Sequence, residues 1–266
     1  MTYRTKLSYL TTWSRHSKRL KYYGKGIAHQ LTPYALCKGS TKRLLEAYRT
    51  HPDHEEMEAR VNYCNKISEP FDASNAPRID EVVRSHSRYY IDLEEHSKGF
   101  GAERRLWYEF GDIVTVPGSP AVVKSRPISP DNANSVVMNL DKIRHFTWSG
   151  DDLPFREKKP AAVWRGSPNT HRRHVLVDRF YDHPTFDIGH FNGDVGGRTP
   201  KPSLTHEDQK QFKFFLSLEG VDVATNLKWG MASNMLVMSP ALEFETWFME
   251  GALEPGKHFV LLENDF

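Results

Sequence analysis

Hydrophobic and polar positions follow their clearest pattern in the second half of the chain. Short apolar runs at Ala161 to Trp164, Phe212 to Leu218 and Met235 to Met238 predict buried strands. His171 to Phe180 and about Val223 to Ala232 have helical patterns instead, and each follows a polar turn. A strand, a helix and a strand at this spacing form a βαβ unit, which implies parallel strands and a right-handed crossover.

The first half of the chain has shorter and less regular segments. Residues 68 to 77 and 189 to 202 are rich in loop-forming residues. Helices are expected at Thr41 to Arg49, Pro52 to Ile67, Ile79 to Ser85 and Leu93 to Lys98, and strands at Arg105 to Phe110 and Ala121 to Ser125. The second of these strands is expected to stop at Arg126-Pro127. The pattern as a whole predicts an α/β fold.

Length and composition place the chain among globular proteins. Its 266 residues can bury the core of one large domain or two modest ones. No stretch approaches the roughly 20 apolar residues of a membrane span, and no apolar segment follows the first basic residues as in a secretory signal. Cys37 and Cys64 lack metal-site spacing and are expected to stay reduced inside a cell. We therefore expect a cytoplasmic protein.

Charge is distributed very unevenly along the chain. Residues 1–50 contain eleven Lys and Arg but only one acid, a net charge of +10, whereas the whole chain has +2. Aromatic residues are interleaved with these cations, at Tyr3, Tyr9, Trp13, Tyr22 and Tyr23. This mixture suits an anionic membrane surface, although it also fits a nucleic-acid-binding segment or a solvated basic face over core aromatics. The first fifty residues contain no known nucleic-acid-binding module.

A first candidate site for an anion spans residues 162 to 173. Arg165 directly follows a predicted strand, and Gly166 permits close approach of the backbone to a ligand. Further hydrogen-bond donors follow at Ser167, Thr170, Arg172 and Arg173. Two arginines eight residues apart across one turn would suit a diphosphate. An ordinary surface loop with solvated arginines would have the same composition.

A second candidate site follows the strand at Phe212 to Leu218. The chain breaks at Glu219-Gly220, and Asp222 is expected to cap a helix that carries Thr225, Asn226 and Lys228. Free N–H groups and the dipole at a helix N-terminus attract anions. The other interpretation is a capped helix of any α/β protein with an exposed lysine. Two such turns in one half of the chain favour the anion site.

Several common site motifs are absent from the sequence. No two aspartates have the Asp-x-Asp spacing with which many nucleotide-sugar enzymes hold a divalent metal. The histidine pairs at i, i+3 have no obvious third ligand, and neither a Walker motif nor a Gly-x-Ser-x-Gly elbow occurs. We therefore expect no metal and no cofactor.

The motifs in their order resemble those of the family 90 glycosyltransferases. They are Trp164-Arg165-Gly166, the run from Glu219 to Trp229, Glu245-Thr246-Trp247-Phe248, and Leu253-x-Pro255-x-x-His258-Phe259-Val260. This family includes capsule-associated and lipopolysaccharide-modifying transferases and is related to the protein O-glucosyltransferases. The similarity extends from about Leu106 to the C-terminus, and the bacterial lipopolysaccharide branch looks most similar.

The resemblance implies two Rossmann-like lobes of the GT-B type and metal-independent, inverting transfer from a UDP-sugar to a hydroxyl of a surface glycan. It implies an acceptor lobe at residues 51–158 and a donor lobe at residues 159–266, after the basic segment 1–50. In this family the catalytic base is an aspartate that follows a strand in the first lobe, and Asp112 fills that place. The phosphate-binding arginines and lysine of the family match Arg165, Arg173 and Lys228.

The sequence departs from the family pattern at two places. Asn226 stands where the eukaryotic members have a phosphate-binding arginine, so Lys124 or Arg126 is expected to supply the missing charge. The chain also ends at Phe266, where relatives continue into a helical region, which predicts a truncated C-terminal part. The alternative function is therefore a non-catalytic protein that binds a nucleotide sugar or a glycan.

Overall fold

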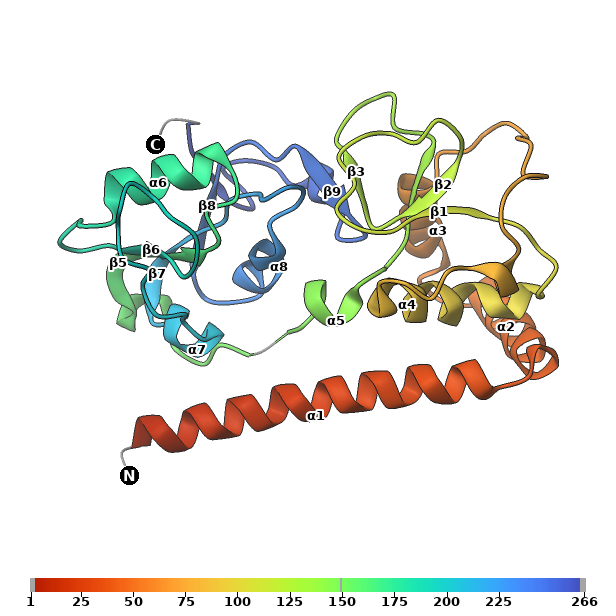
Figure 1. Cartoon of the computed structure of the whole chain (residues 1–266), viewed down its shortest axis with the longest axis horizontal. Coiled ribbons are helices and arrows are strands. Elements are labelled where there is room, and N and C mark those ends of the chain that lie inside the picture. The colour runs from red at the N-terminus through yellow and green to blue at the C-terminus, as the bar shows by residue number, and fades with distance from the viewer. Residues whose placement is uncertain (1–2, 149, 264–266) are drawn as a thin grey trace.

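The computed structural model describes the backbone of residues 3–148 and 150–263, and the side chains within these ranges from residue 17 onward. Two parallel sheets lie beside each other, and one long helix runs along both (Figure 1). The strands of the smaller sheet, here called the N-terminal sheet, all precede residue 138. Those of the larger C-terminal sheet all follow residue 158. The mixed α/β class is therefore confirmed.

The N-terminal sheet has three short parallel strands in the order β1-β2-β4. Helix α4 covers it, because Tyr89, Tyr90 and Leu93 of this helix pack with Leu140 and with Tyr108 of β1. The elements of this part are α1 (Tyr3–Leu31), α2 (Tyr34–Arg49), α3 (His54–Cys64), α4 (Ser87–Ser97), β1 (Trp107–Glu109), β2 (Ala121–Val123), β4 (Ser135–Val137) and α5 (Lys142–His145). Cys37 and Cys64 are buried and free.

The C-terminal sheet has five parallel strands in the order β10-β8-β7-β5-β6. Side chains of β5 alternate between its two faces, so Val163 packs with Leu227 of α8, and Trp164 packs with Leu176 of α6. The two helices therefore cover opposite faces. The elements are β5 (Lys159–Gly166), α6 (His171–Phe180), β6 (Asp187–His190), α7 (His206–Gln209), β7 (Phe212–Leu216), α8 (Thr225–Met231), β8 (Leu236–Ser239) and β10 (Val260–Leu261).

A third, two-stranded sheet ties the N-terminal and C-terminal parts of the chain together. Strand β3 (Ser125–Pro127) directly follows β2, and it pairs antiparallel with β9 (Phe244–Thr246). Arg126 lies opposite Glu245 in this pairing, and its Nε donates to Glu245 Oε1 at 2.7 Å. Both side chains are buried, so the ion pair fixes how β2 and the segment before β9 lie relative to each other.

The structure confirms the parallel βαβ unit and places α6 at the predicted residues, His171–Phe180. Two predicted elements are wrong. Only a three-residue 3₁₀ helix, Ile79–Glu81, forms where a helix to Ser85 was expected. Val83 N–H, which would donate to Ile79 O in a longer α-helix, donates to Tyr108 OH instead. The extended segment also does not stop at Arg126-Pro127, since both residues belong to strand β3.

Candidate functional site

The two anion-site motifs end neighbouring strands of the C-terminal sheet. The chain starts in β5, adds β6 on one side, and then places β7, β8 and β10 on the other side. The connections therefore change direction between β5 and β7. In open parallel sheets, ligands bind outside the carboxyl ends of the strands at such a switch point. The turns at residues 166–170 and 217–224 begin there, so the topology supports the site that the sequence predicts.

Arg173 of α6 connects these two turns. Its Nη1 donates to Ser167 O at 3.1 Å and to Asn169 Oδ1 at 2.8 Å, and its Nη2 donates to Leu218 O at 2.7 Å. A Cβ atom at Gly220 would lie 3.2 Å from Arg173 Nη2, so this glycine lets the second turn approach the guanidinium closely. The predicted residues Ser167, Arg173 and Gly220 are thus brought together.

The charge of Arg173 has no acidic partner in the described part of the chain. Burial lowers the pKa of Arg173 to about 10, and the nearby charge of Arg144 acts in the same direction. The Nε atom is buried and makes no hydrogen bond in the structure. Arg173 is partly buried, and a cation withdrawn from water is costly unless an anion compensates it, so this arginine favours a negatively charged ligand at the switch point.

Lys124 joins the candidate base to the second turn. Its Nζ lies 2.7 Å from Asp112 Oδ1 and 2.6 Å from Asp222 Oδ2. Asp112 follows β1 and Lys124 follows β2, and these parallel neighbours end at the same edge of the N-terminal sheet. Ser125 Oγ also donates to Asp222 Oδ2, at 2.6 Å. Residues that follow strands of the N-terminal sheet and of the C-terminal sheet therefore meet around the ammonium group of Lys124.

The pKa shifts of Asp112 and Lys124 keep both side chains charged at neutral pH. Burial alone would raise the pKa of Asp112, but the hydrogen bond and charge of Lys124, with Arg144 and Arg88, outweigh it and hold the pKa below its usual range. Burial would lower the pKa of Lys124, but Asp222 and the neighbouring Tyr89 and Asp112 raise it above its usual value. The side chain of Asp112 is 36% exposed, so its carboxylate remains open to a substrate.

Asp222 does not cap α8 as the sequence predicted. The helix begins at Thr225 after Ala224, which makes no side-chain cap. The carboxylate of Asp222 is drawn to Lys124 and Ser125 instead, because a buried ammonium group is a stronger partner than a backbone N–H. The predicted contribution of a capped helix N-terminus is therefore wrong for Asp222.

Four other predicted donor-site residues have internal partners. The guanidinium of Arg165 lies 2.6 Å from Asp187 Oδ1, and its other hydrogen bonds go to the carbonyl oxygens of Trp164, Asp187 and Pro202. Lys228 is fully buried, with its Nζ 2.6 Å from Glu250 Oε1. Arg126 is held by Glu245, and Asn226 donates to Leu216 O at 3.1 Å. Gly166 is packed under the ring of Trp164, and Thr225 starts α8.

The glutamate of the second motif organises the chain before β9. Glu219 is buried, and its carboxylate accepts the backbone N–H groups of Glu243 and Phe244, each at 3.1 Å. Burial raises the pKa of Glu219 to about 7, although these N–H groups act in the opposite direction. Its role is therefore to hold the second turn against the segment that pairs with β3.

The short helix α5 adds site residues that the sequence did not reveal. Its Arg144 lies close enough to both Asp112 and Arg173 to lower their pKa values. Its His145 is buried, and neither ring nitrogen has a hydrogen-bond partner in the structure. Burial, followed by the charges of Lys228, Lys124, Arg144 and Arg88, lowers the pKa of His145, so the imidazole is neutral. Buried polar groups without partners point to a bound ligand or ordered water.

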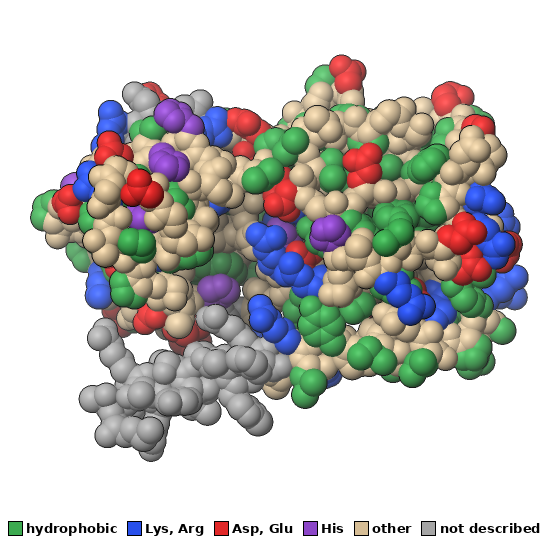
Figure 2. Space-filling model, in the orientation of Figure 1, with side chains coloured by type: hydrophobic (Ala, Val, Ile, Leu, Met, Phe, Trp, Pro, Cys, Tyr) green, Lys and Arg blue, Asp and Glu red, His purple; other side chains and the backbone are tan. Residues whose placement is uncertain are grey.

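The site is rich in cations and offers no metal cage within the described residues. No three His, Cys, Asp or Glu side chains in these ranges lie close enough together to hold a metal ion. Lys, Arg and His side chains gather where the two halves of the molecule meet on the face shown in Figure 2. The arrangement combines one open carboxylate with several cations that carboxylates do not fully neutralise. It therefore suits chemistry on an anionic ligand.

Comparisons with known proteins identify the family of the chain. The family model "Glycosyl transferase family 90" matches residues 137–265, a range that includes α5 and both turns. The chain is 40% identical to "O-glucosyltransferase LpsA" of Dichelobacter nodosus over 257 residues, which cover 95% of this chain and 81% of that relative. Similarity of this extent over almost the whole chain shows that the protein belongs to glycosyltransferase family 90.

Proposed function

We propose that this glycosyltransferase transfers a sugar from a UDP-sugar to a hydroxyl of a glycan acceptor, without a metal ion and with inversion at the anomeric carbon. The observation that carries the proposal is the open, anionic Asp112 near Arg144, which in turn lies near Arg173, a cation without an acidic partner among the described residues. A diphosphate would compensate the partly buried charge of Arg173, which the described carboxylates leave unpaired. The neutral His145 and the free Nε of Arg173 provide further polar contacts.

In the proposed reaction the acceptor oxygen attacks the anomeric carbon while the bond from that carbon to the diphosphate breaks. Asp112 accepts the proton of the acceptor hydroxyl, a contribution of roughly 10²–10⁴ in rate for a positioned base. The departing UDP takes the bonding electrons, and Arg173 and Arg144 stabilise the charge that develops on it. Lys124 keeps Asp112 ionised and holds it against the turn that carries Asp222.

We propose that Arg165 and Lys228 act in the donor site by positioning its turns and not by contacting the phosphates. Arg165 links β5 to β6 through Asp187, and Lys228 links α8 to Glu250, whose carboxylate also accepts Thr246 N–H at 2.6 Å. Both ion pairs lie in the elements that carry or flank the two turns. We propose that these residues keep the turns in place, and that the phosphates contact Arg173 directly.

The relative's name directs the choice of substrates. It describes an O-glucosyltransferase, so UDP-glucose is the first donor to test, and a lipopolysaccharide core or capsule oligosaccharide is the first acceptor. We expect UDP-glucose to raise the melting temperature of the protein and to release UDP only when acceptor is present. The product should be a β-glucoside by NMR, and EDTA should not slow the reaction. UDP binding without turnover on any such acceptor would favour a non-catalytic role, and failure to bind UDP would contradict the proposal.

We also propose that α1 rests on an anionic membrane surface at the cytoplasmic side. No helix in the described part of the chain is long and apolar enough to cross a membrane. Leu20, Ile27 and Leu31 recur at helical spacing and are 77%, 56% and 80% exposed. Arg19 and Lys21 flank this apolar stripe. An exposed apolar stripe bordered by cations is typical of helices that lie in the membrane interface.

The membrane proposal predicts an effect of polar substitutions in the stripe. Leu20→Ser with Ile27→Ser should reduce sedimentation of the protein with phosphatidylglycerol vesicles several-fold, because the apolar contact is lost. Val83→Ser is the matched control, since Val83 is 59% exposed and lies outside α1. Equal sedimentation of both variants would contradict the proposal, as would equal binding of the wild type to neutral phosphatidylcholine vesicles.

A further inference from the structure

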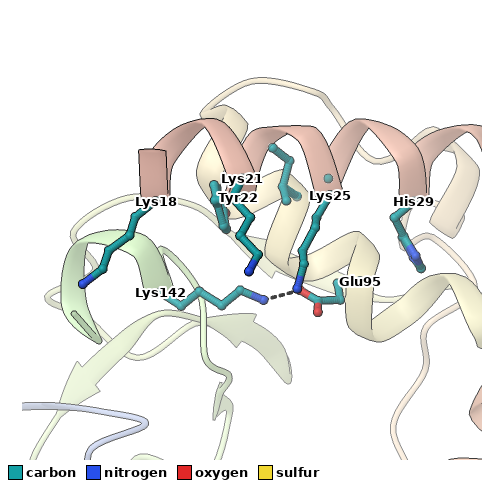
Figure 3. A pocket seen from close by; sticks show the side chains of 9 residues that line it. Lys18, Lys21, Tyr22, Lys25, His29, Glu95 and Lys142 are labelled. Atoms are coloured by element: carbon teal, nitrogen blue, oxygen red, sulfur yellow. Dashed lines mark hydrogen bonds and ion pairs between the residues drawn. The ribbon is translucent and has the colours of Figure 1, made fainter. Parts of the chain in front are cut away.

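A pocket lined by lysines lies between α1 and the body of the protein. It has a volume of about 420 Å³, and Lys18, Lys21 and Lys25 of α1 line it together with Lys142 of α5. Figure 3 shows the side chains of Lys21, Lys25 and Lys142 gathered near Glu95. Pockets of roughly 300–1,000 Å³ bind small molecules in many proteins. The pocket is separate from the turns at the switch point, because no residue after Lys142 lines it.

The helix that supplies three of these lysines is fixed to α4. Tyr22 OH donates to Arg88 O at 3.0 Å and to Asp92 Oδ1 at 2.9 Å. Gly26 packs against Ile91 so closely that a Cβ atom there would lie 2.8 Å from Ile91 Cγ2. Lys98 Nζ, which is buried, donates to His29 O at 2.9 Å at the end of the helix. The lysines therefore extend from a firmly packed backbone.

The pocket has an excess of positive charge. Lys142 pairs with Glu95, and its Nζ lies 3.3 Å from Asp92 Oδ1. The described residues provide no acidic partner for Lys18, Lys21 or Lys25, and Glu95 is the only acid that lines the pocket. Like charges this close repel one another, and a multivalent anion would relieve the repulsion. Lysine binds phosphate as a compact point charge with three donors.

The position of the pocket relates it to the candidate active site. Lys142 is the first residue of α5, and Arg144 and His145 of the same helix lie at the site of Asp112. With a rise of 1.5 Å per residue, Lys142 and His145 are about 4.5 Å apart along the helix axis. A saccharide that enters the site past α5 could thus place one of its substituents in the pocket while a hydroxyl reaches Asp112.

We propose that this pocket binds a phosphate group carried by the acceptor saccharide. This inference rests on the proposed function, and it identifies the acceptor as an anionic, phosphorylated glycan. The ring of Tyr22 and the side chain of Ile91 offer apolar surface beside the lysines for the face of a sugar. Membrane lipid is a poorer occupant, because residues two positions apart on a helix are about 200° apart around its axis. Lys18 and Lys25 therefore lie opposite Leu20 and Ile27.

The test is a ³¹P NMR titration with glucose 6-phosphate in saturating UDP, which fills any donor phosphate site. The wild type should bind glucose 6-phosphate, and the double variant Lys18→Gln with Lys25→Gln should bind it at least tenfold more weakly. Lys38→Gln is the matched control, since Lys38 is an exposed lysine of α2 that does not line the pocket. Glucose, followed by ¹H NMR, should show no binding that depends on these lysines.

The outcomes separate this inference from the proposed function. If the double variant binds glucose 6-phosphate as tightly as the wild type, the pocket does not hold phosphate and the inference is wrong. It is also wrong if the variant loses only binding to phosphatidylglycerol vesicles, because the lysines then serve lipid headgroups. UDP affinity, measured separately by calorimetry, should be equal in all variants. A wild type that binds glucose 6-phosphate through these lysines but does not bind UDP would retain the pocket and contradict only the proposed function.

Discussion

Replacement of Asp112 by asparagine should reduce sugar transfer by roughly 10²–10⁴ while UDP binding stays nearly unchanged. The amide oxygen of the new side chain can still accept the hydrogen bond from Lys124, so the link to Asp222 survives. The amide cannot take up a proton from the acceptor hydroxyl, and only the chemical step is lost. UDP release in the presence of acceptor measures turnover, and calorimetry with UDP measures binding.

Glu109→Gln is the matched control for this substitution. Glu109 is an exposed carboxylate at the end of β1, three residues before Asp112, and it should tolerate the same change without loss of turnover. If Asp112→Asn also turns over at the normal rate, another group is the base. If it loses UDP binding in the same proportion as turnover, the effect is structural and not catalytic.

The order of the strands explains how the sequence could indicate that the two predicted turns lie together. The apolar runs at β5 and β7 are buried from both faces, so they stand out as continuous hydrophobic segments. Glycines and polar residues end both runs. Once two such strands are parallel neighbours, their carboxyl ends lie at the same edge of the sheet, and Arg173 reaches the second turn through Leu218 O. Local pattern was therefore sufficient for this part of the site.

The sequence could not predict which of the site's cations form ion pairs with acidic side chains of the same chain. Arg165 lies in β5, Arg126 in β3 and Lys228 in α8, and the sequence located β5 and α8 correctly or nearly so. Their acidic partners Asp187, Glu245 and Glu250 are distant in sequence or lie in other elements, and only tertiary packing brings them together. A sequence pattern records that a residue is cationic, but it does not record which acid lies opposite.

Helix α5 escaped prediction for a related reason. It has only four residues, too few to show a periodic pattern, and His145 is buried near Lys228 of α8 and Lys124 after β2, which are distant in sequence. The same holds for Asp222, where the local sequence predicted a helix cap but Lys124 provides a stronger partner. In the short segments between the N-terminal and C-terminal sheets, tertiary contacts decide which side chains lie at the candidate site. The sequence pattern alone therefore misses some of these residues.

Arg173 provides the second large expected effect, on donor binding. Arg173→Ala should weaken UDP binding about 10- to 100-fold, because a hydrogen bond to a charged group contributes roughly 1.5–3 kcal/mol. The UDP affinity of Arg173→Lys should lie between those of the alanine variant and the wild type, since lysine keeps the charge but lacks the planar guanidinium with its two parallel donors. Arg172→Ala is the control on the same helix. Arg172 pairs with Glu243 at the surface, and such pairs contribute little.

The stability of the free protein distinguishes a phosphate contact from a structural role. In the free protein Arg173 is partly buried, has no acidic partner in the described chain and lies near the like charge of Arg144. It donates to Ser167 O and Leu218 O. Removing it takes away these hydrogen bonds but also the cost of burying an unpaired charge. The melting temperature without UDP should therefore change less than the increase that UDP produces in the wild type. If Arg173→Ala lowers the melting temperature without UDP strongly but leaves UDP affinity unchanged, the arginine holds the two turns together and the diphosphate binds elsewhere.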